Sequence, residues 1–94
     1  MSEANFIWGT GRRKSAVARV RIRPGTGTIE VNGRKFDEFF PTDATRNLVL
    51  QPLRATGHEA KIDVYARVAG GGVHGQAGAI RLGIARALKR SDET

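Results

Sequence analysis

Residues 15–23 read Ser15-Ala16-Val17-Ala18-Arg19-Val20-Arg21-Ile22-Arg23. Successive side chains of a β-strand point to opposite faces of a sheet, so this alternation predicts a half-buried strand. One face carries small apolar residues, and the other face carries Arg19, Arg21 and Arg23. Side chains on one face of a strand recur every ~6.6 Å. The strand therefore holds three guanidinium groups in a regular row, which suits a phosphate backbone.

Further strands are expected on either side of this one. Residues 6–8 predict a short strand, and residues 9–14 predict a basic loop. The turn-forming residues 24–27 and the alternation of residues 28–31 predict a hairpin partner for the strand at 15–23. Asn32-Gly33 is the preferred dipeptide of a type I′ turn and leads into a short edge strand over residues 34–36. A later strand is predicted with four apolar residues facing inward: Ile62, Val64, Ala66 and Val68.

Two helices complete the expected architecture. Thr42 or Asp43 can cap a helix that Pro52 should kink or end, with a short turn following as far as Gly57. The last helix, about residues 75–90, is amphipathic and places five residues in one apolar arc: Ala77, Ile80, Ile84, Ala87 and Leu88. The order of strands, helix, strand and helix predicts a single α+β domain over residues 1–94. We expect two layers, with a mixed sheet of about four strands and two helices on one face.

The charge distribution predicts a polyanionic partner. Sixteen Lys and Arg against nine Asp and Glu give a net charge of +7. Residues 12–23 carry six cations and residues 67–90 carry five, and neither range contains an acidic residue. Twelve of the sixteen cations are arginine, whose planar fork matches phosphate. A nucleic acid is therefore favoured over a merely solubilising surface, which would mix the two signs.

Catalysis, redox chemistry and membrane insertion find little support in the sequence. The chain has no cysteine, so a reduced, cytoplasmic setting is expected. It has neither the features of a signal peptide nor an apolar stretch near the ~20 residues of a membrane helix. His58 and His74 lie apart, with no carboxylate at metal-binding or catalytic spacing. We therefore expect no enzyme activity, no metal and no cofactor.

Two glycine-containing motifs are candidate RNA-binding loops. Residues 9–15 read GTGRRKS, which lacks the four residues that separate the glycines of a Walker A loop. Residues 70–75 satisfy G-x-G-x-x-G, but no second strand with an acidic residue follows, as a dinucleotide site requires. Glycines permit close approach, and the free N–H groups of a helix N-terminus bind anions. An RNA phosphate is the expected ligand, although Gly75, Gly78 and Gly83 could instead serve close helix packing.

The residues predicted to bind RNA come from these two loops, the arginine row and the last helix. They are Thr10, Gly11, Arg12, Arg13, Lys14, Arg19, Arg21, Arg23, Gly70, Gly71, Gly72, His74, Gly75, Gln76, Arg81 and Arg86. His74 is expected to act as a neutral donor or stacking group, because a helix N-terminus disfavours its cationic form.

Residues 9–20 and 70–88, in this order, closely resemble the bacterial small-subunit ribosomal protein nine family. Asn32-Gly33 and Gln51-Pro52-Leu53 fall at matching places between them, and the resemblance covers residues 5–94. It implies a structural constituent of the small ribosomal subunit, acting in translation, that binds rRNA in the subunit head beside neighbouring head proteins. It also implies the fold of the second domain of ribosomal protein five, with an unusual left-handed strand–helix–strand crossover.

Members of that family continue into a long Lys- and Arg-rich tail that reaches the P-site tRNA, whereas residues 91–94 read Ser-Asp-Glu-Thr. We therefore expect no tRNA contact from this chain. Two alternatives are a ribonuclease P-like protein subunit or other structured-RNA binder, and a phosphate-transfer enzyme using the glycine loop. The basic helix motif of the ribonuclease P subunit is not found in this sequence.

Overall fold

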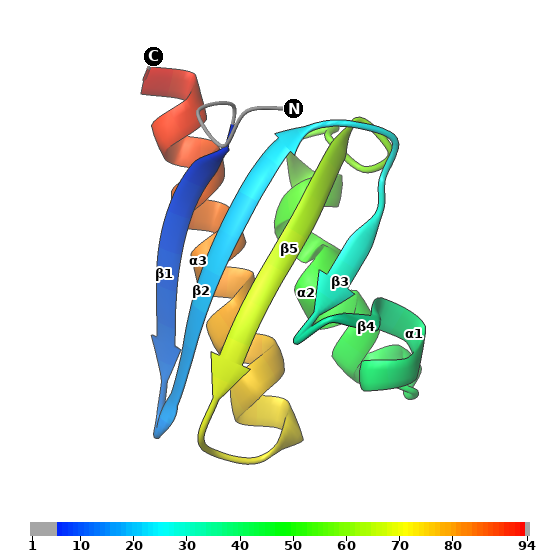
Figure 1. Cartoon of the computed structure of the whole chain (residues 1–94), viewed down its shortest axis with the longest axis vertical. Coiled ribbons are helices and arrows are strands. Elements are labelled where there is room, and N and C mark those ends of the chain that lie inside the picture. The colour runs from blue at the N-terminus through cyan, green and yellow to red at the C-terminus, as the bar shows by residue number, and fades with distance from the viewer. Residues whose placement is uncertain (1–5, 94) are drawn as a thin grey trace.

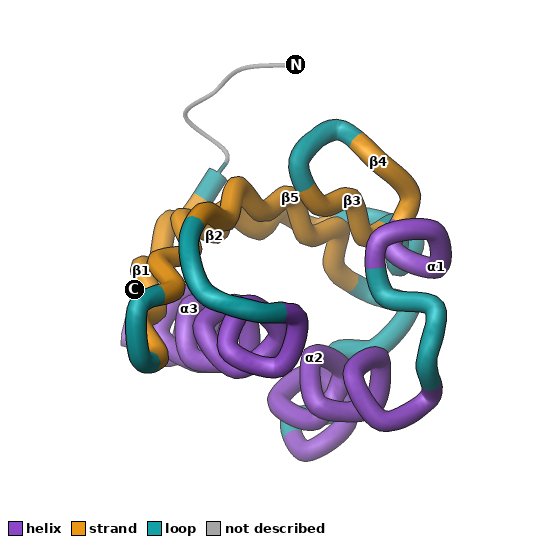
Figure 2. The backbone as a smooth tube through the Cα atoms, turned by 90° about the horizontal axis from the view of Figure 1, so that it is seen from below, coloured by secondary structure: helices purple, strands orange, loops and turns teal. Residues whose placement is uncertain are grey.

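Five strands form one mixed sheet in the computed structural model, which describes residues 6–93. In chain order the elements are β1 (Ile7–Arg13), β2 (Ala16–Pro24), β3 (Ile29–Val31), β4 (Arg34–Lys35), α1 (Phe36–Phe39), α2 (Asp43–Ala55), β5 (Ile62–Ala69) and α3 (Val73–Glu93). The strand order in the sheet is β1-β2-β5-β3-β4 (Figure 1). The helices α2 and α3 both lie against one face of the sheet (Figure 2). This confirms the predicted two-layer α+β class, with one more strand and one more short helix than expected.

The strand β2 has the two faces that its alternation predicts. Its apolar residues Ala16, Ala18, Val20 and Ile22 are buried. On the other face, Arg19 is exposed, while Arg21 and Arg23 are half-buried. Antiparallel neighbours flank β2 on both sides, namely β1 and β5. The apolar face of β2 therefore lies at the centre of the core, where it packs with β5 and α3.

The predicted hairpin between β2 and β3 is wrong. The strand β3 pairs with β5 in parallel and with β4 antiparallel, and β5 lies between β2 and β3. Asp63 of β5 binds the connection between β2 and β3, because its Oδ1 accepts the backbone N–H groups of Thr26, Gly27 and Thr28 at 3.0, 3.2 and 3.0 Å. The turn after β2 is thus shaped by a carboxylate more than thirty residues away, which local patterning does not reveal.

The Asn32-Gly33 turn is confirmed. Both residues have positive φ, 53° and 77°, as a type I′ turn requires, and they join β3 to β4. The chain then passes through α1, beside the β3–β4 edge, and through α2, behind the sheet of Figure 1, before it enters β5 (Figure 2). In that view β3 and β5 both run downward and β5 lies to the left of β3, so the crossover is left-handed. This is the rare hand, and it agrees with what the family resemblance implies.

The helix α2 begins as predicted but continues past the residue at which a break was predicted. Thr42 is the N-cap and its side chain accepts the N–H of Thr45 at 3.5 Å. The helix then continues through Pro52 to Ala55, so the predicted break at Pro52 is wrong. Thr45, Val49 and Leu53 recur every four residues and are all buried. Their packing keeps the helix continuous although Pro52 lacks one backbone donor.

The strand β1 is longer than predicted, because residues 9–13 are strand and not loop. Gly9 and Gly11 face α3, and a Cβ atom added at either one would collide with the helix backbone, at the carbonyl of Gly83 for Gly9 and of Ala79 for Gly11. The strand and the helix therefore touch backbone to backbone. These glycines serve packing, which also explains why Gly11 is buried.

The helix α3 confirms the predicted apolar arc, since all five of its residues are buried: Ala77, Ile80, Ile84, Ala87 and Leu88. Leu82, on its polar side, is half-buried. Among residues 6–93, no helix has the length and apolar character needed to cross a membrane.

We expect Gly11→Ala to lower the free energy of unfolding by at least about 2 kcal/mol, because the new methyl group must separate β1 from α3. Gly72→Ala is the control. A Cβ atom at Gly72 meets nothing within 4 Å, and its φ lies outside the positive region. Urea unfolding of both variants measures the difference, and equal stabilities would contradict the backbone contact.

Candidate nucleic-acid interface

The basic loop and the glycine loop predicted from sequence meet at one end of the sheet. The turn from β1 to β2 and the connection from β5 to α3 both lie at the lower end of Figure 1. A Cβ atom added to Gly70 would collide with the carbonyl of Ser15, and one on Gly71 would lie 3.2 Å from the Cβ of Ala16. Gly70 and Gly71 have φ of 81° and 68°, which favours glycine. The two motifs thus form one surface, although 55 residues separate residue 15 from residue 70.

The helix α3 begins directly beside this turn. The carbonyl of Gly72 accepts the N–H of Gln76 at 2.9 Å, and the side chain of Gln76 donates to the carbonyl of Gly70 at 3.2 Å. His74 is exposed, and the first turn of α3 contains no acidic residue. The first N–H groups of a helix have no partner within the helix and carry partial positive charge. This end of α3 is therefore suited to an anion.

The basic turn is held against α3 by the stem of Arg13. A Cβ atom on Gly78 would lie 2.6 Å from Cδ of Arg13, so the absence of a side chain at Gly78 makes room for that stem. The space beside Gly83 is occupied in the same way by the side chain of Val20, whose Cγ2 would lie 2.6 Å from a Cβ atom added at Gly83. Gly78 and Gly83 therefore serve packing. The exposed cations of the turn are Arg12, Arg13 and Lys14.

The face of the sheet that points away from the helices, called here the open face, combines arginines with aromatic rings. Cζ of Arg21 lies 4.8, 5.7 and 5.2 Å from the ring centroids of Phe6, Trp8 and Tyr65. Arg23 donates to the hydroxyl of Tyr65 at 3.1 Å. These contacts are cation–π and hydrogen-bonding interactions that fix both guanidinium groups. Two of the three arginines in the predicted row are thus held by the protein itself.

The family comparison agrees with this arrangement. Residues 11–94 match the family model described as ribosomal protein S9/S16. The chain belongs to the ribosomal protein S9/S16 family. The match covers both the basic turn and the glycine loop, and it confirms the resemblance seen in the sequence. As a ribosomal protein, the chain is a structural component of a ribonucleoprotein that acts in translation, and rRNA and other ribosomal proteins are its partners.

Of the two alternatives, neither the ribonuclease P-like subunit nor the phosphate-transfer enzyme gains support from the match. Within residues 6–93, no group of three or more His, Asp or Glu side chains could hold a metal ion.

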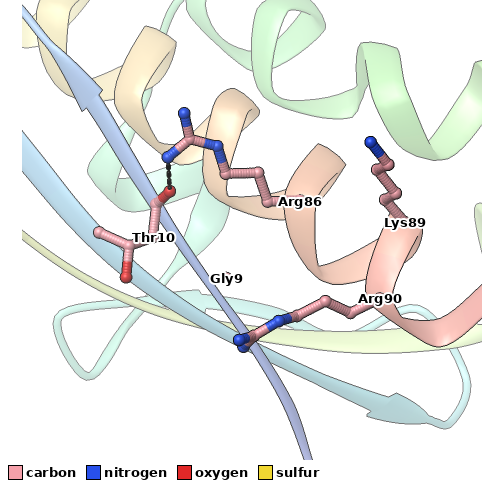
Figure 3. A pocket seen from close by; sticks show the side chains of 5 residues that line it. All are labelled: Gly9, Thr10, Arg86, Lys89 and Arg90. Carbon is pink, nitrogen blue, oxygen red and sulfur yellow. Dashed lines mark hydrogen bonds between the residues drawn. The ribbon is translucent and has the colours of Figure 1, made fainter. Parts of the chain in front are cut away.

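The outer side of α3 in this S9/S16 protein carries a second basic region (Figure 3). Arg86 donates to the carbonyl of Thr10, and Arg90 donates to the carbonyl of Trp8, each at 2.8 Å. Four residues of helix rise ~6 Å and two residues of strand ~6.6 Å, so the two spacings match. The arginines thereby cover carbonyls of the edge strand β1. Lys89 and Arg90 were absent from the predicted site, although both lie on the polar side of the last helix.

Arg81 takes part in a different tertiary contact. Its Nε donates to Oε1 of Gln51 at 2.8 Å and so connects α3 to α2. Sequence reasoning also missed Arg67, Tyr65 and Trp8 as members of the open face. The alternation of β5 indicates that Arg67 and Tyr65 point away from the core. Only the strand order in the sheet, however, places them beside the arginines of β2.

Asp63 is the carboxylate that balances the arginines at one end of the open face. Burial alone would raise the pKa of Asp63, but the backbone N–H groups of Thr28, Thr26 and Gly27 and the charge of Arg23 outweigh it and lower the pKa. Nε of Arg23 lies 3.7 Å from Oδ2 of Asp63. The ionised form therefore stabilises the fold.

We expect Asp63→Asn to lower the free energy of unfolding at pH 7 by about 2 kcal/mol, because hydrogen bonds to a charged acceptor are lost. The pKa is lowered in the folded protein, so this contribution is complete above the unfolded pKa of about 4 and disappears as the pH falls through the lower folded pKa. The wild type and the variant should converge below pH 4 in urea titrations. Glu59→Gln, which breaks only the exposed pair with Arg54, is the control. A gap that persists unchanged at pH 3 would contradict this assignment.

Proposed function

We propose that this S9/S16 protein is a structural constituent of the small subunit of cytoplasmic ribosomes and binds rRNA in the subunit head, next to other head proteins. The observation that carries the proposal is the meeting of the basic turn with the glycine loop and the start of α3. Three exposed cations and the first backbone N–H groups of α3 lie together there on one surface. Such a surface suits phosphate oxygens, because cations and backbone N–H groups contact phosphates without regard to base sequence.

The proposed rRNA contact keeps most of the residues predicted from sequence. At the loop end they are Arg12, Arg13, Lys14, Gly70, Gly71, Gly72, His74, Gly75 and Gln76, and Arg19 continues the surface onto the open face. Gly11 is assigned to packing, and Arg81 to the contact with α2. Arg21, Arg23 and Arg86 contribute as neighbours whose guanidinium groups already contact aromatic rings, a hydroxyl or a carbonyl within the protein, and Thr10 contributes as a neighbour whose carbonyl accepts from Arg86.

A substitution at Gly72 distinguishes the role of the glycine loop in folding from its proposed role in RNA binding. Gly70 and Gly71 need their positive φ, whereas Gly72 has ordinary φ and open space around a potential Cβ. A methyl group at Gly72 therefore leaves the fold intact and obstructs only what approaches from outside. Any loss of binding on this substitution reports a close approach of the RNA backbone to the start of α3.

We expect the protein to bind small-subunit rRNA with a slope of log K against log salt of about −4 to −7, as five to eight phosphate contacts would give. Gly72→Ala should weaken binding several-fold without changing this slope, because it removes no cation. Lys14→Gln should reduce the slope by about 0.7 to 0.9. Filter-binding titrations at several salt concentrations measure both.

Lys61→Gln serves as the control for Lys14→Gln, since Lys61 is also exposed but lies in the loop before β5, outside the proposed contact. Equal effects of the two lysine variants, or normal binding by Gly72→Ala, would place the rRNA elsewhere on the surface.

A further inference from the structure

Two arginines of the open face oppose each other without an acidic partner among residues 6–93. Arg19 of β2 pairs with Arg67 of β5, and both are exposed. Like charges directly opposite on neighbouring strands repel each other. The ion pairs of the described residues are Arg23–Asp63, Arg46–Asp43 and Arg54–Glu59, and none of them involves Arg19 or Arg67. A bound anion between the two guanidinium groups would relieve this repulsion.

Thr10 extends this row on the other side of Arg19, because β1 pairs Thr10 with Arg19. Its side chain is exposed, and its carbonyl is already occupied by Arg86. The row from Thr10 through Arg19 to Arg67 thus offers a hydroxyl group and two guanidinium groups. Such a set of donors is matched by the oxygen atoms of one phosphate.

The next row of the open face is aromatic. Trp8, Arg21 and Tyr65 lie side by side on β1, β2 and β5. The guanidinium of Arg21 lies near both rings, and its Nε is buried without a hydrogen-bond partner among the described residues. Trp8 nevertheless remains 41% exposed. A large ring that is held by its neighbours and open to solvent is a stacking platform for a nucleobase.

The two rows are two residues apart along each strand, which is ~6.6 Å. A nucleotide spans a comparable distance from its base to its own phosphate. We propose that the open face binds one unpaired nucleotide of the rRNA, with its base stacked on Trp8 and its phosphate between Arg19 and Arg67. This inference rests on the proposed function and specifies which form of RNA this face accepts.

A base within an A-form duplex is stacked on its neighbours and cannot reach a protein ring, whereas bases of loops and bulges can. Glu30, the acidic residue next to Tyr65 in the sheet, is paired across the strands with Lys35. Glu30 is therefore the next residue of the aromatic row, beyond Tyr65, whereas the row of Thr10, Arg19 and Arg67 contains no carboxylate among the described residues. An acidic protein segment would also match the charge, but it would make no use of the exposed indole.

Trp8 is the only tryptophan of the chain, so its fluorescence reports this site alone. We expect a single-stranded octa-adenylate to quench Trp8, and an eight-base-pair RNA duplex to bind without quenching. Trp8→Leu should weaken binding of fluorescently labelled octa-adenylate, measured by anisotropy, about five- to hundredfold, and leave duplex binding unchanged. Arg19→Gln and Arg67→Gln should each reduce the salt slope for the single strand by about 0.7, and Lys61→Gln should not.

If Trp8→Leu impairs folding, Arg19→Gln and Arg67→Gln still test the inference. Both arginine side chains are exposed, so these substitutions should leave the fold intact. Binding of small-subunit rRNA with the expected salt slope but without a change in Trp8 fluorescence would overturn this inference and leave the proposed function standing. Equal quenching by the duplex or by poly-glutamate would also overturn it. Quenching by octa-adenylate together with failure to bind rRNA would overturn the proposed function and support the nucleotide site.

Discussion

The backbone contact between β1 and α3 is the constraint on which the rest of the structure depends. It exists because Gly9 and Gly11 have no side chains and α3 presents Ala79 and Gly83 at the same place. At this distance Arg86 and its neighbour one turn later can reach the carbonyls of β1. The same contact brings the start of α3 beside the turn between β1 and β2. Larger side chains on β1 would move the basic turn and the glycine loop apart.

The glycines of this protein therefore divide into three physical roles. Some remove a Cβ atom so that the backbone of β1 and α3 can meet, as at Gly11. Others supply a positive φ that reverses the chain between β5 and α3, as at Gly70 and Gly71. Gly72 has neither function within the fold, since its surroundings are open and its φ is ordinary. We propose that its bare backbone serves the approach of a ligand, which would distinguish it from its neighbours.

Sequence patterns predicted the elements whose side chains alternate or recur regularly, including β2, β5 and the apolar arc of α3. They failed where a distant contact decides the local structure. The hairpin expected at β3 is replaced by pairing with β5, because Asp63 binds the turn after β2. Pro52 stays within a helix because buried neighbours on the same face hold it. The candidate site was predicted as two separate motifs. That Arg19 lies opposite Arg67 could not be predicted, because it depends on β2 and β5 being neighbours in the sheet.

The positive charge of the open face is not equally available along its length. At the end near Asp63, Arg21 and Arg23 are engaged by aromatic rings, a hydroxyl and a carboxylate. Toward the glycine loop, Arg19 and Arg67 lack such partners among the described residues, and the exposed cations of the basic turn follow, Arg12 and Lys14 among them. The open face thus carries arginines held by contacts within the protein at one end, and arginines without such contacts among the described residues at the other. We propose that a single RNA strand runs along these cations toward the start of α3, because binding there would leave the ion pairs of the fold intact.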